Sequence, residues 1–219
     1  MRAALLDALG TLVELERPWP HLVAELRARG VAVGEDDARR AMLAEMAYYK
    51  RHHDDARDFA GLKDLRRRCA GIVRAELGTA LPVGDVEDAM LAAIRFRPYP
   101  EVPGVLAALG GRGVARVVVS NWDVSLHDVL ERTRLRPLLD AVVTSAEFGA
   151  AKPDPSIFRH ALALAGATPA EAVHAGDDVE ADVEGARAAG IAAVLVARDG
   201  IEAPPGVRTV RTLEGLLAG

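Results

Sequence analysis

The stretch Ala3-Ala4-Leu5-Leu6-Asp7-Ala8-Leu9-Gly10-Thr11 decides the fold of this chain. Its four apolar residues, Ala3 to Leu6, predict a short buried strand, and Asp7 follows directly at the carboxyl end of that strand. Open α/β sheets bind their ligands outside the carboxyl ends of the strands. The stretch therefore predicts a functional site at Asp7.

The chain beyond residue 100 repeats this arrangement. Apolar runs that predict strands lie at 116–119, 141–144, 172–175, 192–196 and 207–210. Helical patterns separate them, starting near Pro103 and spanning roughly 124–133, 155–165 and 179–189. Alternating strands and helices predict an α/β fold, a Rossmann-like parallel sheet covered by helices on both faces.

Residues 14–97 show a different pattern. Apolar residues recur there at helical spacing, no convincing strand is visible, and Pro98-Tyr99-Pro100 marks the end of the segment. We therefore predict two domains. The core domain comprises residues 1–13 and 98–219, and an inserted domain of about four helices comprises residues 14–97.

Composition excludes several classes of protein. The net charge of −5 argues against a nucleic-acid-binding surface or a polybasic membrane patch. Cys69 is the only cysteine, which excludes an intramolecular disulfide and a cysteine-rich metal site. No apolar run approaches the ~20 residues of a membrane span. We expect a soluble cytoplasmic protein, a monomer or homodimer, whose partner is a small molecule.

Polar clusters follow the predicted strands. They are Asp7 to Thr11, Ser120-Asn121, Lys152 within Gly149 to Pro155, and Gly176-Asp177-Asp178 with Asp182 beyond. Because the strands of a parallel sheet end at the same edge, these groups are expected to converge. Several carboxylates brought together repel one another unless a cation lies among them, and an oxygen-only ligand set suits Mg²⁺. Lysine is rare in this arginine-rich chain, so Lys152 stands out.

These four motifs, in this order, resemble those of the haloacid dehalogenase superfamily over nearly the whole chain. The resemblance implies a helical cap at residues 14–97. The stretch Glu147 to Phe158 is similar to a phosphatase-like branch of that superfamily.

The resemblance also implies roles for individual residues. Asp7 would attack phosphorus and ligate Mg²⁺ together with the Leu9 carbonyl and Asp177. Lys152 would neutralise the crowded carboxylates and the phosphoryl group. The remaining groups expected to hold phosphoryl oxygens are Thr11, Ser120 and Asn121.

Leu9 departs from the pattern of the superfamily's phosphatases, which usually carry Asp two residues after the nucleophile. That Asp protonates the leaving alcohol and then activates water, a contribution worth roughly 10²–10⁴ in rate. Three interpretations follow: a hydrolase with impaired or rerouted acid–base catalysis, a binding or regulatory protein without turnover, or different chemistry. A rerouted proton would come from the helical domain, where His52 and His53 are the candidates.

Two versions of different chemistry can be weighed. Dehalogenases of the superfamily need no metal and have a different fourth motif, so Gly176-Asp177-Asp178 argues against dehalogenation. Phosphonoacetaldehyde hydrolases use a cap lysine as a Schiff base, and Lys50 or Lys63 would have to serve, but nothing around either lysine makes a specific match. The leading prediction is a Mg²⁺-dependent hydrolase that acts on a small phosphorylated metabolite through an aspartyl-phosphate.

Other residues have simpler interpretations. Asp178 either caps the helix that follows it or associates with the metal. Asp182 is expected to support the site. Asp123 is expected to be a helix N-cap, and His174 is expected to be packed in its strand.

Overall fold

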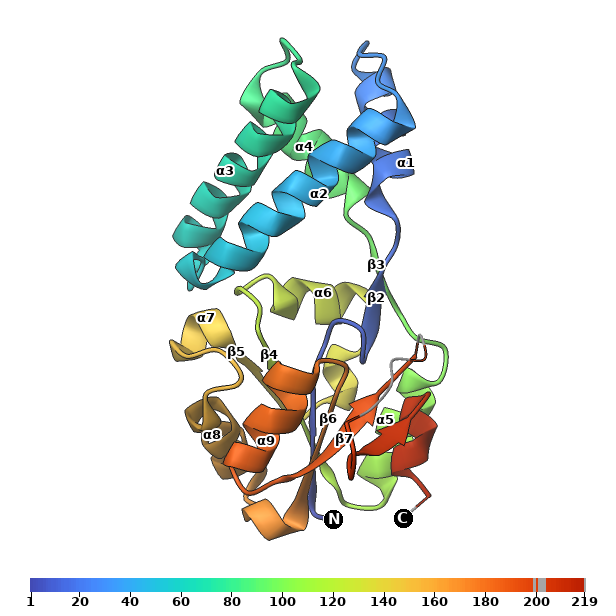
Figure 1. Ribbon diagram of the computed structural model, residues 1–219, viewed down its shortest axis with the longest axis vertical. Helices are drawn as coiled ribbons and strands as arrows, with labels where there is room; N and C mark the ends of the chain where they lie inside the picture. Colours follow the sequence, from blue (N-terminus) through green and yellow to red (C-terminus); the bar gives the residue numbers. More distant parts are fainter. Residues whose placement is uncertain (199, 201–203, 219) are drawn as a thin grey trace. The chain divides into compact units, whose positions relative to one another are not determined.

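The computed structural model describes residues 1–198, 200 and 204–218 of the chain (Figure 1). The chain divides into two compact units. One comprises Met1–Glu14 and Arg97–Gly219, and the other comprises Leu15–Phe96. Within the described residues, no helix is both long enough and apolar enough to cross a membrane.

The first unit is built on a six-stranded sheet with the order β5-β4-β1-β6-β7-β8. Every neighbouring pair of strands is parallel. The strands are β1 (Ala3–Leu6), β4 (Ala115–Ser120), β5 (Ala141–Thr144), β6 (Ala172–Gly176), β7 (Ala192–Val196) and β8 (Arg208–Val210). This sheet confirms the predicted α/β fold.

β1 lies in the middle of the sheet because its four residues are apolar and fully buried. Leu5 is in register with Val117 of β4 on one side and with His174 of β6 on the other. The strand therefore delivers Asp7 to the centre of the carboxyl edge, between the ends of β4 and β6.

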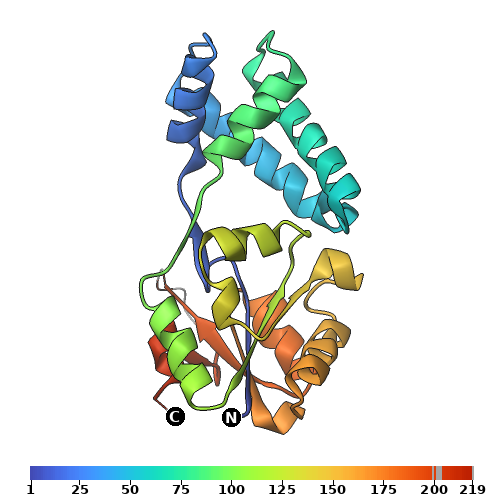
Figure 2. The same ribbon diagram turned by 180° about the vertical axis from the view of Figure 1, so that it is seen from behind.

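Helices cover both faces of the sheet (Figures 1 and 2). They are α5 (Val102–Gly111), α6 (Leu126–Arg132), α7 (Ser145–Phe148), α8 (Pro155–Ala165) and α9 (Gly185–Ala188). Shorter helical turns are η2 (Arg136–Leu138), η3 (Pro169–Glu171) and η5 (Leu213–Leu216). Ile157 and Phe158 of α8 belong to one buried core cluster with Leu5 and other strand residues, so α8 is anchored to the sheet.

The start of α8 is set by local chemistry. The Asp154 side chain accepts the backbone N–H of Ser156 at 2.8 Å, and Pro155 occupies the first turn. A side-chain cap satisfies a backbone N–H that the helix itself leaves unpaired. Proline is tolerated at the first helical position, because the N–H that it lacks would have no partner there. Because Lys152 lies three residues before α8, this cap also fixes the loop that carries Lys152.

The predicted helix over 179–189 has a different form. A π-helical turn, η4 (Val179–Glu184), precedes the short helix α9. π-turns are rare and are concentrated at functional sites. Here the turn carries Asp182.

The second unit contains four helices: α1 (Pro18–Ala28), α2 (Glu35–His52), α3 (Phe59–Leu77) and α4 (Val83–Ala93), with a short turn η1 (His53–Asp55). Apolar residues at helical spacing, such as Leu62, Leu65 and Val73 of α3, form the buried face. The short strands β2 (Val13–Leu15) and β3 (Phe96–Pro98) pair with each other where the chain passes between the units. The sequence did not predict them, because three residues are too few to display an alternating pattern.

We predict that Gly185→Ala destabilises the first unit. A Cβ atom at Gly185 would lie 2.8 Å from Cε2 of Phe158 and 2.9 Å from Cα of Pro153. Overpacking of this kind costs about 1–3 kcal/mol of the free energy of unfolding. Urea unfolding, followed by the fluorescence of the buried Trp122, measures the loss. Gly104→Ala in α5 is the control, because a Cβ there meets nothing within 4 Å. Equal stability of the two variants would contradict this packing.

Candidate active site

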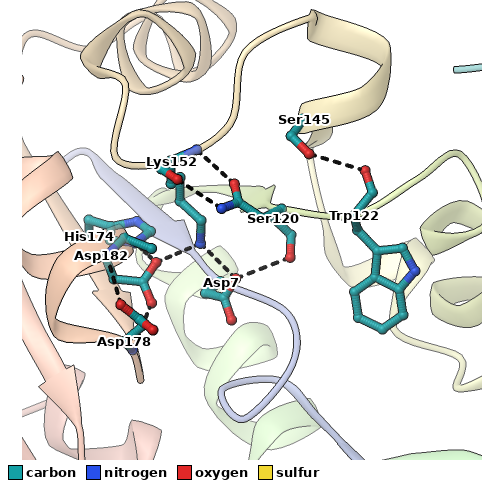
Figure 3. A network of polar contacts seen from close by, with 10 residues as sticks. Asp7, Ser120, Trp122, Ser145, Lys152, His174, Asp178 and Asp182 are labelled. Carbon is teal, nitrogen blue, oxygen red and sulfur yellow. Dashed lines mark hydrogen bonds and ion pairs between the residues drawn. The ribbon is translucent and has the colours of Figure 1, made fainter. Parts of the chain in front are cut away.

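The site lies at the carboxyl edge of the sheet, and all its residues belong to the first unit (Figure 3). Asp7 follows β1, Ser120 ends β4, Lys152 precedes α8, and Asp182 lies on η4 after β6. These four side chains are buried. The structure thus brings together four residues that are distant in the sequence, as the parallel topology predicts.

The Lys152 ammonium group lies between two carboxylates. Its Nζ donates to Asp7 Oδ1 at 2.7 Å and to Asp182 Oδ1 at 2.5 Å. Burial lowers the pKa of Lys152, but the attraction of Asp7 and Asp182 outweighs burial and raises it well above its ordinary value. Lys152 is therefore a permanent cation in this site.

Asp7 and Asp182 respond differently to the same lysine. Burial raises the pKa of Asp7 more than the attraction of Lys152 lowers it, and Asp182 adds to the increase. Burial also acts to raise the pKa of Asp182, but Lys152 and His174 overcome this and hold it well below its ordinary range. Asp182 is thus the fixed counter-ion of the lysine.

Asp182 has further partners. His174 Nε2 lies 2.9 Å from Asp182 Oδ1, and the backbone N–H of Asp178 donates to Asp182 Oδ2 at 3.0 Å. Because an ionised carboxylate only accepts hydrogen bonds, His174 must carry its proton on Nε2. His174 is fully buried and packs edge-on against Phe158. It is packed in its strand as predicted, and it also holds Asp182, which the sequence did not predict.

Ser120 and Asn121, which end β4 and follow it, form hydrogen bonds with different partners. Ser120 Oγ donates to Asp7 Oδ1 at 3.1 Å. The Asn121 side chain pairs with the Lys152 backbone in both directions, since Nδ2 donates to the Lys152 carbonyl at 2.9 Å and Oδ1 accepts its N–H at 2.7 Å. Asn121 therefore positions Lys152, a role that no local sequence pattern shows.

Asp177 lies beside this network, and among the residues that the structure describes no basic side chain forms an ion pair with it. Burial, Asp7 and Asp182 together raise its pKa to about 7. The Gly10 turn packs directly against it: a Cβ atom at Gly10 would lie 2.1 Å from Asp177 Oδ2, and Gly10 has φ of +79°. Only glycine combines that conformation with so close an approach.

The donor set fits a hard divalent cation. Asp7, Asp177 and Asp182 each offer a carboxylate oxygen, and these oxygens lie within 4.8 Å of one another. Because Lys152 is shared between Asp7 and Asp182, Asp177 leaves excess negative charge in the group. Oxygen ligands with few carboxylates are what Mg²⁺ prefers. Asp7 and Asp177 are the residues that could hold it, with Asp182 retained by the lysine.

Two residues of the first motif lie outside the Asp7 network. Thr11 is fully buried, and within the part of the chain that the structure describes its Oγ1 has no hydrogen-bond partner. The Leu9 side chain is 45% exposed and offers no group for proton transfer.

Other predicted residues have local partners. Asp178 caps η4 by accepting the N–H of Ala181 at 2.8 Å. Asp123 was expected to be the N-cap of the following helix; instead it accepts the N–H of Ser125, the residue before α6, at 2.6 Å. In the second unit, His52 and His53 lie beside Asp55 and Asp54 respectively, each at 3.4 Å.

Sequence reasoning missed Arg198, whose guanidinium donates to the carbonyls of Gly10 and Thr11 at 3.0 and 2.7 Å. Arg198 follows β7 at the same edge of the sheet where the predicted motifs lie. Its position after a buried strand was the only available signal.

We predict that Asp177 links stability to pH in the metal-free protein. Its folded pKa of about 7 exceeds its ordinary value of 3.8, so the folded state binds more protons between these values. The contribution of Asp177 to stability is therefore favourable at low pH and declines as pH rises from about 4 to about 7. Melting temperatures from pH 5 to 8 should fall more steeply in the wild type than in Asp177→Asn.

Added Mg²⁺ should remove most of the decline of the wild-type melting temperature with pH. Mg²⁺ should also bind more tightly at pH 8 than at pH 6, because at pH 8 it no longer competes with a proton on Asp177. Asp128→Asn, at an exposed position of α6, is the control and should follow the wild type. Identical pH profiles for the wild type and Asp177→Asn would contradict the excess charge at this residue.

Comparisons with known proteins show the family of this chain. Residues 1–190 match the family model described as haloacid dehalogenase-like hydrolase. The chain is 33% identical over 214 residues to haloacid dehalogenase-like hydrolase domain-containing protein 3 of Mus musculus, covering 90% of this chain and 82% of the relative. It is 28% identical over 203 residues to glyceraldehyde 3-phosphate phosphatase of Methanopyrus kandleri, covering 90% and 84%.

Among solved structures, the HAD phosphatase from Thermococcus onnurineus superposes with a TM-score of 0.67 and 25% identity, covering 100% of this chain and 97% of the other. The family match covers most of the chain and includes all the motifs that meet at Asp7. The chain therefore belongs to the haloacid dehalogenase-like hydrolases.

Proposed function

We propose that this protein is a Mg²⁺-dependent phosphohydrolase that uses Asp7 as its nucleophile and acts on a small phosphorylated metabolite. The observation that carries the proposal is the pair of hydrogen bonds to Asp7 Oδ1 from Lys152 and Ser120. They fix one carboxylate oxygen, while the second oxygen points away from both donors (Figure 3). A relative named as a phosphatase of glyceraldehyde 3-phosphate supports phosphate monoesters as the substrate class.

The reaction has two displacements. A free oxygen of Asp7 attacks phosphorus, the bond from phosphorus to the leaving oxygen breaks, and an aspartyl-phosphate forms. Water then attacks the same phosphorus, the acyl oxygen leaves, and Asp7 and inorganic phosphate are released. Lys152 and Ser120 hold Asp7 in position and stabilise the negative charge at the reacting centre.

The proposed metal ligands are Asp7, Asp177 and the Leu9 carbonyl. When bound, Mg²⁺ would neutralise the phosphoryl oxygens and the excess carboxylate charge. A leucine in this place still supplies the carbonyl, because that ligand belongs to the backbone.

Leu9 determines which leaving groups the site can expel. An alkyl ester leaves as an alkoxide and needs a proton, whereas acyl and aryl phosphates release weaker bases that need little help. We propose that activated phosphates are the better substrates of this chain. The helical unit Leu15–Phe96 is proposed to be a cap that selects the substrate.

We predict that wild-type protein with Mg²⁺ hydrolyses p-nitrophenyl phosphate and acetyl phosphate, and that Asp7→Asn abolishes both activities. An amide is a poor nucleophile, so no aspartyl-phosphate can form. Phosphate release measures the rates, and Asp128→Asn is the control. Activity that survives in Asp7→Asn would contradict the assignment of the nucleophile. Absence of activity in the wild type on a broad panel of phosphate esters would favour a binding or regulatory protein instead.

We also predict that Leu9→Asp raises the hydrolysis of alkyl phosphates by at least about tenfold, within the roughly 10²–10⁴ that general acid–base catalysis supplies. The kcat/KM for acetyl phosphate should change less, because it reports the formation of the aspartyl-phosphate and the leaving acetate needs no proton in that step. The ratio of kcat/KM for the two substrates is the measurement, with Leu9→Asn as the matched variant that cannot transfer a proton. Equal ratios in Leu9→Asp and Leu9→Asn would show that another group already supplies the proton.

A further inference from the structure

The side chain of Arg198 binds the backbone of the Asp7–Thr11 motif. Nε donates to the Gly10 carbonyl at 3.0 Å, and Nη2 donates to the Thr11 carbonyl at 2.7 Å. Two donors of one planar guanidinium therefore hold two consecutive carbonyls. A lysine has one ammonium group on a flexible stem and cannot reproduce this fork.

The guanidinium is itself held from two sides. Glu101 Oε1 lies 2.8 Å from Nη2, and the Tyr99 ring stacks on the guanidinium, with 3.4 Å between Cζ and the ring centroid. The side chains of Arg198 and Glu101 are only 13% and 11% exposed. Burial acts to raise the pKa of Glu101, but its hydrogen bonds, including that from Arg198, outweigh burial and lower it, so Glu101 stays ionised. A buried ion pair with an aromatic partner has little freedom to move.

These contacts lead to the metal-binding end of the proposed site. Arg198 holds the Gly10 carbonyl, and Gly10 lies so close to Asp177 that a Cβ there would overlap the carboxylate. Leu9, whose carbonyl is a proposed metal ligand, lies two residues after Asp7 and directly before Gly10. A displacement of this turn would therefore change the separation between the groups proposed to hold Mg²⁺.

We infer that Arg198 is a positioning residue that holds the Gly10–Thr11 turn against Asp177 and so sets the geometry of Asp7, the Leu9 carbonyl and Asp177 for cation binding and phosphoryl transfer. This inference rests on the proposed function. Among the described residues, the guanidinium of Arg198 bonds to the Gly10 and Thr11 carbonyls and to Glu101, so we infer that it acts through the backbone of the turn.

The test compares Arg198→Met and Arg198→Lys with Arg112→Met. Arg112 is the matched control, because it also donates to a backbone carbonyl of the first unit, that of Leu217 at 2.9 Å. Isothermal titration calorimetry gives the Kd for Mg²⁺ without turnover. Steady-state hydrolysis of p-nitrophenyl phosphate at saturating Mg²⁺ gives kcat and KM. The melting temperature of each metal-free variant shows whether it is folded.

We expect Arg198→Met to weaken Mg²⁺ binding and lower kcat by about tenfold or more each, which is the usual cost of losing a residue that orients metal ligands. KM should change less than kcat. Arg198→Lys should resemble Arg198→Met more than the wild type, because it keeps the charge and loses the fork. Arg112→Met should match the wild type in Kd and kcat.

A purely structural role would lower the melting temperature of the Arg198 variants and leave Kd and kcat unchanged below the transition, and that result would overturn the inference. If Arg198→Met does not fold, Glu101→Gln loosens the same guanidinium more gently and should shift Kd for Mg²⁺ in the same direction. An unchanged Kd in folded Glu101→Gln and Arg198→Lys would also overturn it. A wild type that neither binds Mg²⁺ nor hydrolyses phosphates would instead contradict the proposed function.

Discussion

The buried ammonium group of Lys152 between Asp7 and Asp182 is the interaction on which the rest of the site depends. Removing one member of a buried ion pair typically costs about 3–5 kcal/mol, because the remaining charge is left without a partner. The fold secures this lysine at several points. Asn121 binds its backbone in both directions, the capped start of α8 follows three residues later, and His174 holds Asp182 from the neighbouring strand. These contacts fix one oxygen of Asp7, as in-line attack by the proposed nucleophile requires.

Lys152 forms ion pairs with Asp7 and Asp182 but not with Asp177, and the proposed metal site depends on this difference. Asp177 has a pKa near 7 because it is partly buried beside two other carboxylates. A divalent cation would relieve that charge. Leu9 affects a separate property: its side chain cannot move a proton, whereas the proposed metal ligand is its backbone carbonyl. Under the proposed function, metal binding through that carbonyl and acid–base catalysis are therefore separable in this chain.

Strong local patterns allowed much of the fold to be predicted. β1, β5, β7 and α8 have the predicted limits, because uniform apolar runs and a proline start are unambiguous. The short strands β2 and β3 and the π-turn η4 escaped prediction, since they are too short to impose a period. The groups around Asp7 could be anticipated because parallel strands end at one edge. The individual hydrogen bonds of these groups could not be predicted. The contact from Arg198 to Gly10 spans 188 residues, and the Asn121 side chain binds backbone atoms of Lys152. Such contacts depend on the packed fold and leave no local pattern.

Under the proposed function, Asp7 is phosphorylated and Leu9 slows the release of the phosphoryl group. The most direct measurement is an acid quench of the wild-type protein after brief incubation with acetyl phosphate and Mg²⁺, followed by mass spectrometry of its peptides. We predict one phosphoryl group on Asp7, formed faster than steady-state turnover and lost more slowly than in Leu9→Asp. A phosphoryl group on another residue, or none on Asp7 while phosphate is released, would contradict it.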